Sequence, residues 1–172
     1  MQTLSGTREL KDMYIHEELE KLPLHLKAIA DAHMRAGNNE ISALKEVKLE
    51  QDIEALPDRL KDIADMYLLQ GYTRTGALRE AETQKDIEAL PPKKKAFAEK
   101  YLENGYSPTE AFYEVQVREN IEALPADLKA FVKKYLENGI SPSKAMEEGQ
   151  RESERYAQEN AQKIISSIKE RK

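Results

Sequence analysis

Residues 87–125 read IEALPPKKKAFAEKYLENGYSPTEAFYEVQVRENIEALP, so the pentapeptide IEALP opens and closes this stretch with a spacing of 34 residues. The same pentapeptide begins at Ile53, and a weaker copy, LEKLP, begins at Leu19. Prolines and glycines, two residue types that mark helix boundaries, also recur every 34 residues, which indicates a tandem repeat. They are Pro23, Pro57, Pro91 and Pro125, and Gly37, Gly71, Gly105 and Gly139.

Each repeat contains the boundary signals of two helices. Proline has a fixed φ and no N–H to lose in a first helical turn, and glycine ends helices, so each proline-to-glycine segment predicts one helix, helix A. Its apolar residues follow a helical period, as in Leu60, Ile63, Ala64 and Tyr67. Two positions after each glycine comes a side chain that predicts the N-cap of a second helix, helix B: Asn39, Thr73, Ser107 and Ser141.

These signals predict an all-α fold of the αα-repeat solenoid class, with nine helices in a single domain over residues 1–172. A single hairpin of this length cannot bury its own apolar faces, so the stacking of successive copies would supply the core. The predicted parts are a half repeat, 5–22, four 34-residue helical hairpins, 23–56, 57–90, 91–124 and 125–158, and a long last helix with a C-terminal extension, 159–172.

The composition restricts the chemistry that the chain can perform. It contains no cysteine, which excludes disulfides, thiolate metal sites and cysteine nucleophiles. Charged residues make up 34% and hydrophobic residues 40%, a balance that suits amphipathic helices. No window reaches the ~18 apolar residues of a membrane span, and the N-terminus lacks the apolar core of a signal peptide. We therefore expect a soluble, cytoplasmic protein that does not bind membranes.

No arrangement of residues predicts an enzyme. The histidines His16, His25 and His33 form no i,i+4 pair and no HExxH motif. Acidic residues recur with the repeat period, which would place them on successive repeats instead of in one enclosed site. They are Glu20, Glu54, Glu88 and Glu122. We expect no catalytic residue, no metal and no cofactor.

The period and the motif YLENGYSPTEAF, residues 101–112, followed by IEALP resemble the tetratricopeptide repeat family. That family also has an aromatic residue and a glycine near the end of helix A, an alanine early in helix B and a proline at the repeat boundary. Helix A is shorter and helix B longer in this chain. The resemblance implies a right-handed superhelix in which helix A lines a concave, protein-binding surface.

A second resemblance is local to each copy. Residues 94–111, with Lys94, Phe97, Tyr101 and Gly105, resemble the N-terminal helix-turn-helix of small terminase subunits from tailed phages. This resemblance implies a phage-related protein that binds nucleic acid. The net charge of −5 disfavours that function.

Two sets of residues are candidates for binding a protein partner. One is a lysine at a fixed position of helix A, which stacking would turn into a ladder for an acidic peptide or a phosphate backbone: Lys27, Lys61, Lys95 and Lys129. The alternative is i,i+4 pairing with the acids that follow in three copies, Asp31, Asp65 and Glu99. The other set lies in the turns and comprises Tyr72, Tyr106 and Ile140. These residues either anchor a partner or pack helix B onto its own repeat as a hydrophobic staple.

Two further surfaces carry the alternative functions. Lysine runs in the last two repeats either bind nucleic acid or form a solvated face: Lys93, Lys94, Lys133 and Lys134. The end of the last helix carries apolar residues that no following repeat covers, and these are candidates for self-association: Ile164, Ile165 and Ile168. The leading hypothesis is a non-enzymatic interaction module that binds a protein partner of unknown identity through helix A and the turns.

Overall fold

The computed structural model describes the backbone of residues 13–170 and the side chains of residues 13–164. Residues 13–20 are helical, and eight helices follow. They are α2 (Leu24–Arg35), α3 (Glu40–Glu54), α4 (Asp58–Leu69), α5 (Arg74–Ala89), α6 (Pro92–Glu103), α7 (Pro108–Glu122), α8 (Ala126–Glu137) and α9 (Pro142–Glu170). The described residues contain no strand, so the all-α prediction is confirmed. Residues 5–12 of the predicted half repeat lie outside the described residues.

The chain divides into two compact units, Met1–Lys85 and Asp86–Lys172, and the boundary falls inside α5. Each unit contains two clusters of buried apolar side chains among its described residues. The organisation of these repeats into one continuous domain stays a prediction.

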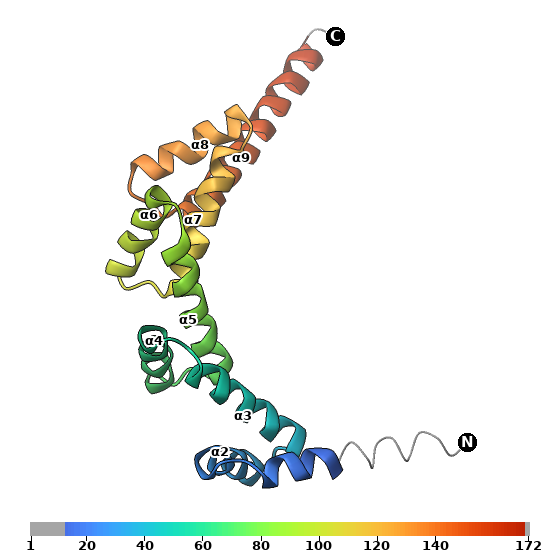
Figure 1. Ribbon diagram of the computed structural model, residues 1–172. Coiled ribbons are helices and arrows are strands. Elements are labelled where there is room, and N and C mark those ends of the chain that lie inside the picture. The colour runs from blue at the N-terminus through green and yellow to red at the C-terminus, as the bar shows by residue number, and fades with distance from the viewer. Residues whose placement is uncertain (1–12, 171–172) are drawn as a thin grey trace, which may run out of the picture. The chain divides into compact units, whose positions relative to one another are not determined.

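In the first unit, α2 and α3 pack against each other, as Figure 1 shows. Each of its clusters joins the end of one helix B to the hairpin that follows. The first cluster consists of Ile15, Leu19, Leu26, Ala30, Ala43 and Val47. The second consists of Ile53, Leu60, Ala64, Tyr67, Ala77 and Ala81.

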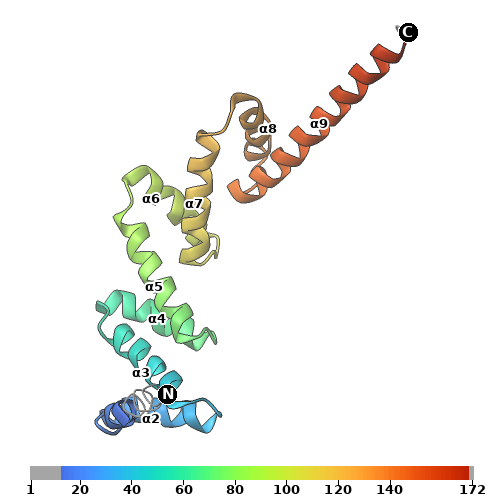
Figure 2. The ribbon, with the colours of Figure 1, turned by 90° about the vertical axis from the view of Figure 1, so that its right-hand side faces the viewer.

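In the second unit, α6 packs on α7, α8 packs on α9, and α7 also contacts α9 (Figure 2). One cluster consists of Ile87, Ala98, Ala111 and Val115, and the other of Val117, Ile121, Val132 and Ala145. The clusters of both units use corresponding repeat positions. The clearest case is an alanine early in helix B that is fully buried and lets the helices approach closely: Ala43, Ala77, Ala111 and Ala145.

The predicted boundaries of helix A are confirmed, with a shift of one residue at the start. Each proline is the N-cap, with φ between −55° and −53°, and the helix begins at the next residue. At the other end, each glycine has a positive φ of 78° to 90°, which side-chain-bearing residues rarely adopt. In α4, Gly71 N–H donates to Leu68 O and Tyr72 N–H donates to Tyr67 O, both at 3.0 Å. This pair of hydrogen bonds is a Schellman ending.

Helix B begins at the predicted caps. Asn39 Oδ1 accepts a hydrogen bond from the backbone N–H of Ser42 at 2.9 Å, and Thr73 Oγ1 accepts one from Gly76 at 3.2 Å. Ser107 and Glu110 accept from each other's backbone N–H, so the predicted capping box is present. These bonds satisfy N–H groups that have no partner inside the helix.

The last helix B continues as α9 to Glu170, which confirms the predicted long C-terminal helix. Its backbone is helical through Gly149. Among the described residues, no helix combines the length and the apolar character needed to cross a lipid bilayer.

Candidate functional site

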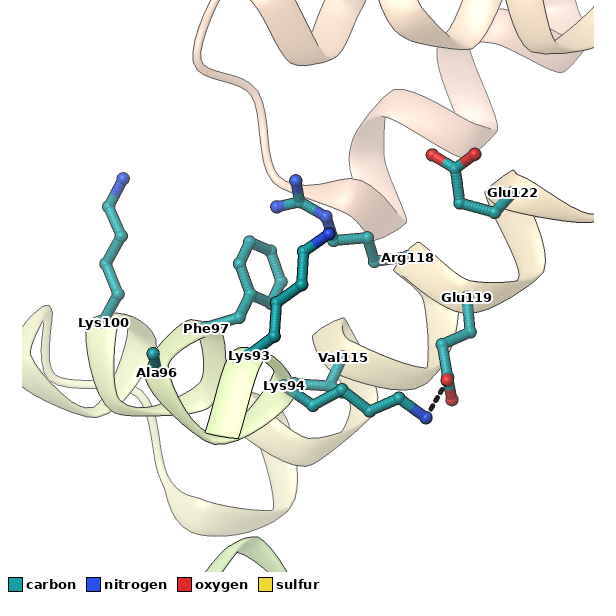
Figure 3. Close-up of a pocket in the computed structure, with 9 residues that line it drawn as sticks. All are labelled: Lys93, Lys94, Ala96, Phe97, Lys100, Val115, Arg118, Glu119 and Glu122. Carbon is teal, nitrogen blue, oxygen red and sulfur yellow. Dashed lines mark ion pairs between the residues drawn. The ribbon is translucent and has the colours of Figure 1, made fainter. Parts of the chain in front are cut away.

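A groove with a volume of about 510 Å³ lies between α6 and α7 in the third repeat (Figure 3). Phe97 from α6 and Val115 from α7 give it an apolar floor. The charged side chains at its rim are four basic and two acidic: Lys93, Lys94, Lys100, Arg118, Glu119 and Glu122. The groove is therefore locally basic although the whole chain carries a net charge of −5.

One residue that lines the groove is a lysine where the other repeats have a leucine. Lys94 occupies the repeat position that is leucine in the other three copies: Leu26, Leu60 and Leu128. Two of those leucines are core residues, with 2% and 5% of their surface exposed, whereas the Lys94 side chain is 40% exposed. A lysine cannot bury its charged end in an apolar space, so the Lys94 ammonium lies at the surface, where it pairs with Glu119.

Arg118 is the second basic residue that sets the third repeat apart. The corresponding residues of the other repeats are acidic or neutral: Glu50, Gln84 and Glu152. The Arg118 guanidinium carbon lies 4.1 Å from the centre of the Phe97 ring. A guanidinium can stack on an aromatic face while its N–H groups remain available to a carboxylate.

The basic side chains of the groove differ in how well they are neutralised. Lys94 forms an ion pair with Glu119, drawn as the dashed line in Figure 3. Lys93 and Lys100 have no ion-pair partner within the part of the chain that the structure describes. Lys93 and Arg118 both line the groove (Figure 3). Two cations that face the same space favour an anionic ligand there.

The four lysines of the nucleic-acid hypothesis do not gather at one site. Lys93 and Lys94 line the groove, whereas Lys133 and Lys134 lie on α8 and are not among its lining residues. Lys134 forms an ion pair with Glu152 at 2.9 Å. The hydrogen bond and the charge of Glu152 raise the pKa of Lys134.

The helix A lysines have a common placement: Lys27, Lys61, Lys95 and Lys129 are all half-buried. Lys129 Nζ donates to the backbone oxygen of Glu122 at 2.7 Å and lies 2.6 Å from the Glu122 carboxylate. This lysine therefore joins the start of its own helix A to the end of the preceding helix B. The hydrogen bond from Lys129 to the Glu122 carboxylate, with the charge of Lys129, lowers the pKa of Glu122.

The turn residues pack onto the helix that precedes them. Tyr72 meets Tyr67 and Tyr106 meets Tyr101 in edge-on ring contacts with centroids 5.0 Å apart. Ile140 is partly buried against the last cluster. The contact between the residue after the glycine and the last turn of helix A is the apolar contact that accompanies a Schellman ending. Tyr72 and Tyr106 still expose 43% and 37% of their surface.

A glutamate that recurs in helix B was missed by the sequence analysis. Glutamate occupies the same helix B position in all four repeats: Glu46, Glu80, Glu114 and Glu148. Glu80 and Glu114 are only 2% and 5% exposed. Glu46 contacts Arg74, and Glu114 accepts hydrogen bonds from Ser143, so both reach the first turn of the next helix B. The signal that could have identified these residues is that this position of helix B is glutamate in all four repeats.

The three histidines make separate contacts. His16 lies 3.1 Å from Glu40, His25 lies 3.2 Å from Glu54, and His33 bonds the hydroxyl of Ser42 at 3.0 Å. Within the described residues no group of three or more potential metal ligands comes together.

The candidate residues for self-association are only partly described. Ile164 on α9 is 60% exposed. The side chains of Ile165 and Ile168 lie outside the described residues.

Comparison with known proteins provides no relative whose site could be compared with this groove. No protein-family model, no curated protein and no solved structure matches the chain. Its function is therefore inferred from the residues of the groove and the repeats themselves.

Proposed function

We propose that the chain is an αα-repeat solenoid that acts as a non-enzymatic adaptor by binding a protein partner. The recurrence of the same buried positions in all four apolar clusters supports the solenoid architecture. Repeats that contact mainly their neighbours leave long surfaces for recognition, which is the usual use of this architecture.

The observation that carries the binding function is the groove of the third repeat. Leucine at the position of Lys94 would bury apolar surface, as Leu26 and Leu60 do. A sequence that places lysine there loses this stabilisation and gains an open, basic groove. Departures from the packing rules of a fold are typical of functional sites.

The helix A lysines and the turn residues belong to the same proposal. Lys27, Lys61 and Lys95 are partly exposed, so their ammonium groups remain available for a partner. Tyr72 and Tyr106 offer the edges of rings whose positions are fixed by packing, which limits the entropy lost on binding. Ile140 is the weakest candidate of this set because it packs against the core of its own repeat.

Nucleic-acid binding is the second candidate, because the groove is basic. Three features favour a protein over a phosphate backbone. Lys94 and Lys134 already pair with carboxylates of the chain, and Glu119 and Glu122 line the groove and would repel phosphates. An extended polyanion also needs a continuous basic track, which the separate lysine runs do not provide.

The test is affinity purification of the tagged full-length chain from its native lysate, with one half of the sample treated with nuclease. We expect a protein that is retained in both halves and forms a complex of defined size when the two purified proteins are mixed. Cross-links in that complex should fall on helix A and the turns. Recovery that nuclease abolishes would contradict the proposal in favour of nucleic-acid binding.

A further inference from the structure

The groove between α6 and α7 also indicates what kind of segment it binds, and this inference rests on the proposed function. Its rim has more positive than negative charge, and Lys93 and Lys100 lack ion-pair partners in the described part of the chain. The Arg118 guanidinium stacks on Phe97 and makes no hydrogen bond to the described residues. A carboxylate is the planar anion that a guanidinium binds through two parallel hydrogen bonds.

The floor of the groove requires a second chemical feature in the ligand. Phe97 is partly exposed, and Ala96 and the aliphatic stems of Lys93 and Lys94 line the groove together with it (Figure 3). A ligand with charged groups alone would leave this apolar surface in water. A large aliphatic or aromatic side chain would cover it and gain the free energy of apolar burial.

Charge complementarity and floor chemistry together select one class of partner. We infer that this groove binds an acidic peptide segment carrying one large apolar side chain. That side chain lies on Phe97, and flanking carboxylates pair with Lys93 and Arg118. Glu119 and Glu122 line the groove and repel negative charge, so the groove disfavours a ligand with closely spaced charges, such as a phosphate backbone. A peptide whose carboxylates are spaced apart avoids this repulsion.

A substitution at Lys94 tests this inference through protein stability as well as through binding. Lys94→Leu restores the residue of the other repeats, closes the floor and removes one positive charge. It should raise the melting temperature and weaken binding in the same protein. Such opposite effects separate a binding residue from one that only supports the fold.

The experiment measures fluorescence anisotropy of a labelled synthetic peptide, in which glutamates flank a single leucine, titrated with the full-length chain. Two further probes are the same peptide with serine in place of leucine and a single-stranded oligonucleotide. The variants are Lys94→Leu and Arg118→Glu, and the matched control is Lys144→Leu, which makes the same change at an exposed lysine of α9.

We expect Lys94→Leu and Arg118→Glu each to raise the Kd for the leucine peptide by about tenfold or more. Arg118→Glu removes a charge-assisted contact to the ligand. Lys94→Leu closes the floor and leaves Glu119 without its ion-pair partner, so that Glu119 repels the carboxylates of the peptide. Lys144→Leu should leave the Kd unchanged. The inference is overturned if both groove variants bind like the wild-type chain. It is also overturned if the serine peptide binds equally well, or if the oligonucleotide binds more tightly than the peptide.

The same variants distinguish this inference from the proposed function. A purified partner that binds the wild-type chain and both groove variants equally well leaves the adaptor function intact and overturns the groove assignment. Retention of peptide binding without any nuclease-resistant protein partner in the lysate contradicts the adaptor function and supports the groove specificity. Arg118 is exposed on α7, so Arg118→Glu remains informative if Lys94→Leu fails to fold.

Discussion

Glu114 of α7 accepts two hydrogen bonds from Ser143 in the first turn of α9, one from its backbone N–H at 2.9 Å and one from its hydroxyl at 2.5 Å. The first N–H groups of a helix have no intrahelical partner, and negative charge near them is favourable. Because the two residues belong to successive repeats, the cap of one helix B is supplied by the helix B before it.

Glu114→Ala is therefore expected to lower the free energy of unfolding by about 2–3 kcal/mol, since it leaves a partly buried N–H and hydroxyl without their charged acceptor. The matched control is Glu148→Ala. Glu148 has the same repeat position but a side chain 34% exposed that pairs with Arg151 in its own helix. Its replacement should cost less than about 1 kcal/mol. Urea unfolding measures both, and equal costs would contradict the inter-repeat cap.

Gly149 is expected to tolerate no side chain, because α9 approaches α8 closely there. An added Cβ would lie 2.5 Å from Val132 Cγ2 and 3.0 Å from two backbone atoms of the same residue. Gly149→Ala should therefore cost about 1–3 kcal/mol through overpacking, even though alanine is the better helix former. In the control Gly76→Ala, the nearest atoms are 3.4 Å away. That change should stabilise by about 0.5–1 kcal/mol, and thermal unfolding that gives both variants the same sign would refute this prediction.

The ion pair between Lys129 and Glu122 should make stability depend on pH. Lys129 lowers the pKa of Glu122 below its usual value of 4.5. The folded carboxylate then binds a proton less readily than the unfolded one, so the pair stabilises the fold above about pH 4.5 and loses this contribution as the pH falls through the folded pKa. The melting temperature of Glu122→Gln should lie below that of the wild-type chain at neutral pH and converge with it in acid.

A double-mutant cycle with Lys129→Met provides the control for this pair. The two substitutions should be less than additive at neutral pH and additive in acid, where the Glu122 carboxyl is protonated in both states. A coupling that does not change with pH would assign the contact to packing instead of charge.

Tyr106 is expected to stabilise its own repeat. Its ring contacts Tyr101 edge-on with centroids 5.0 Å apart. Tyr106→Ala should lower the free energy of unfolding by about 1 kcal/mol, whereas Tyr106→Phe keeps the ring contact and should be nearly neutral. Chemical denaturation distinguishes the two. A neutral alanine variant would mean that Tyr106 serves a partner alone.

Local chemistry made much of the fold predictable. Proline at Pro57 and glycine at Gly71 act through their own backbone preferences, and the Ser107 cap needs a partner only three residues away. The apolar period of helix A was also readable, because the face that it defines is the face that packs. These features depend on residues that are neighbours along the chain.

The groove required the tertiary structure. Lys93 and Lys94 were identified from the sequence as basic residues, but the role of Arg118 and Phe97 was not. A comparison of the repeat positions would have shown that Lys94 replaces a leucine. It would not have shown that a groove lies between α6 and α7 or that the Arg118 guanidinium lies 4.1 Å from the centre of the Phe97 ring.

What this sequence determined by itself is the set of helices, their boundaries and their 34-residue period, because proline, glycine and capping residues act within one helical turn. Which charges are neutralised and which remain available was decided only by the tertiary structure. Lys129 meets a residue seven positions before it and Glu114 meets one 29 positions after it. Such partners are chosen by the packing of one helix against another, which brings residues together across spacings that no local preference encodes.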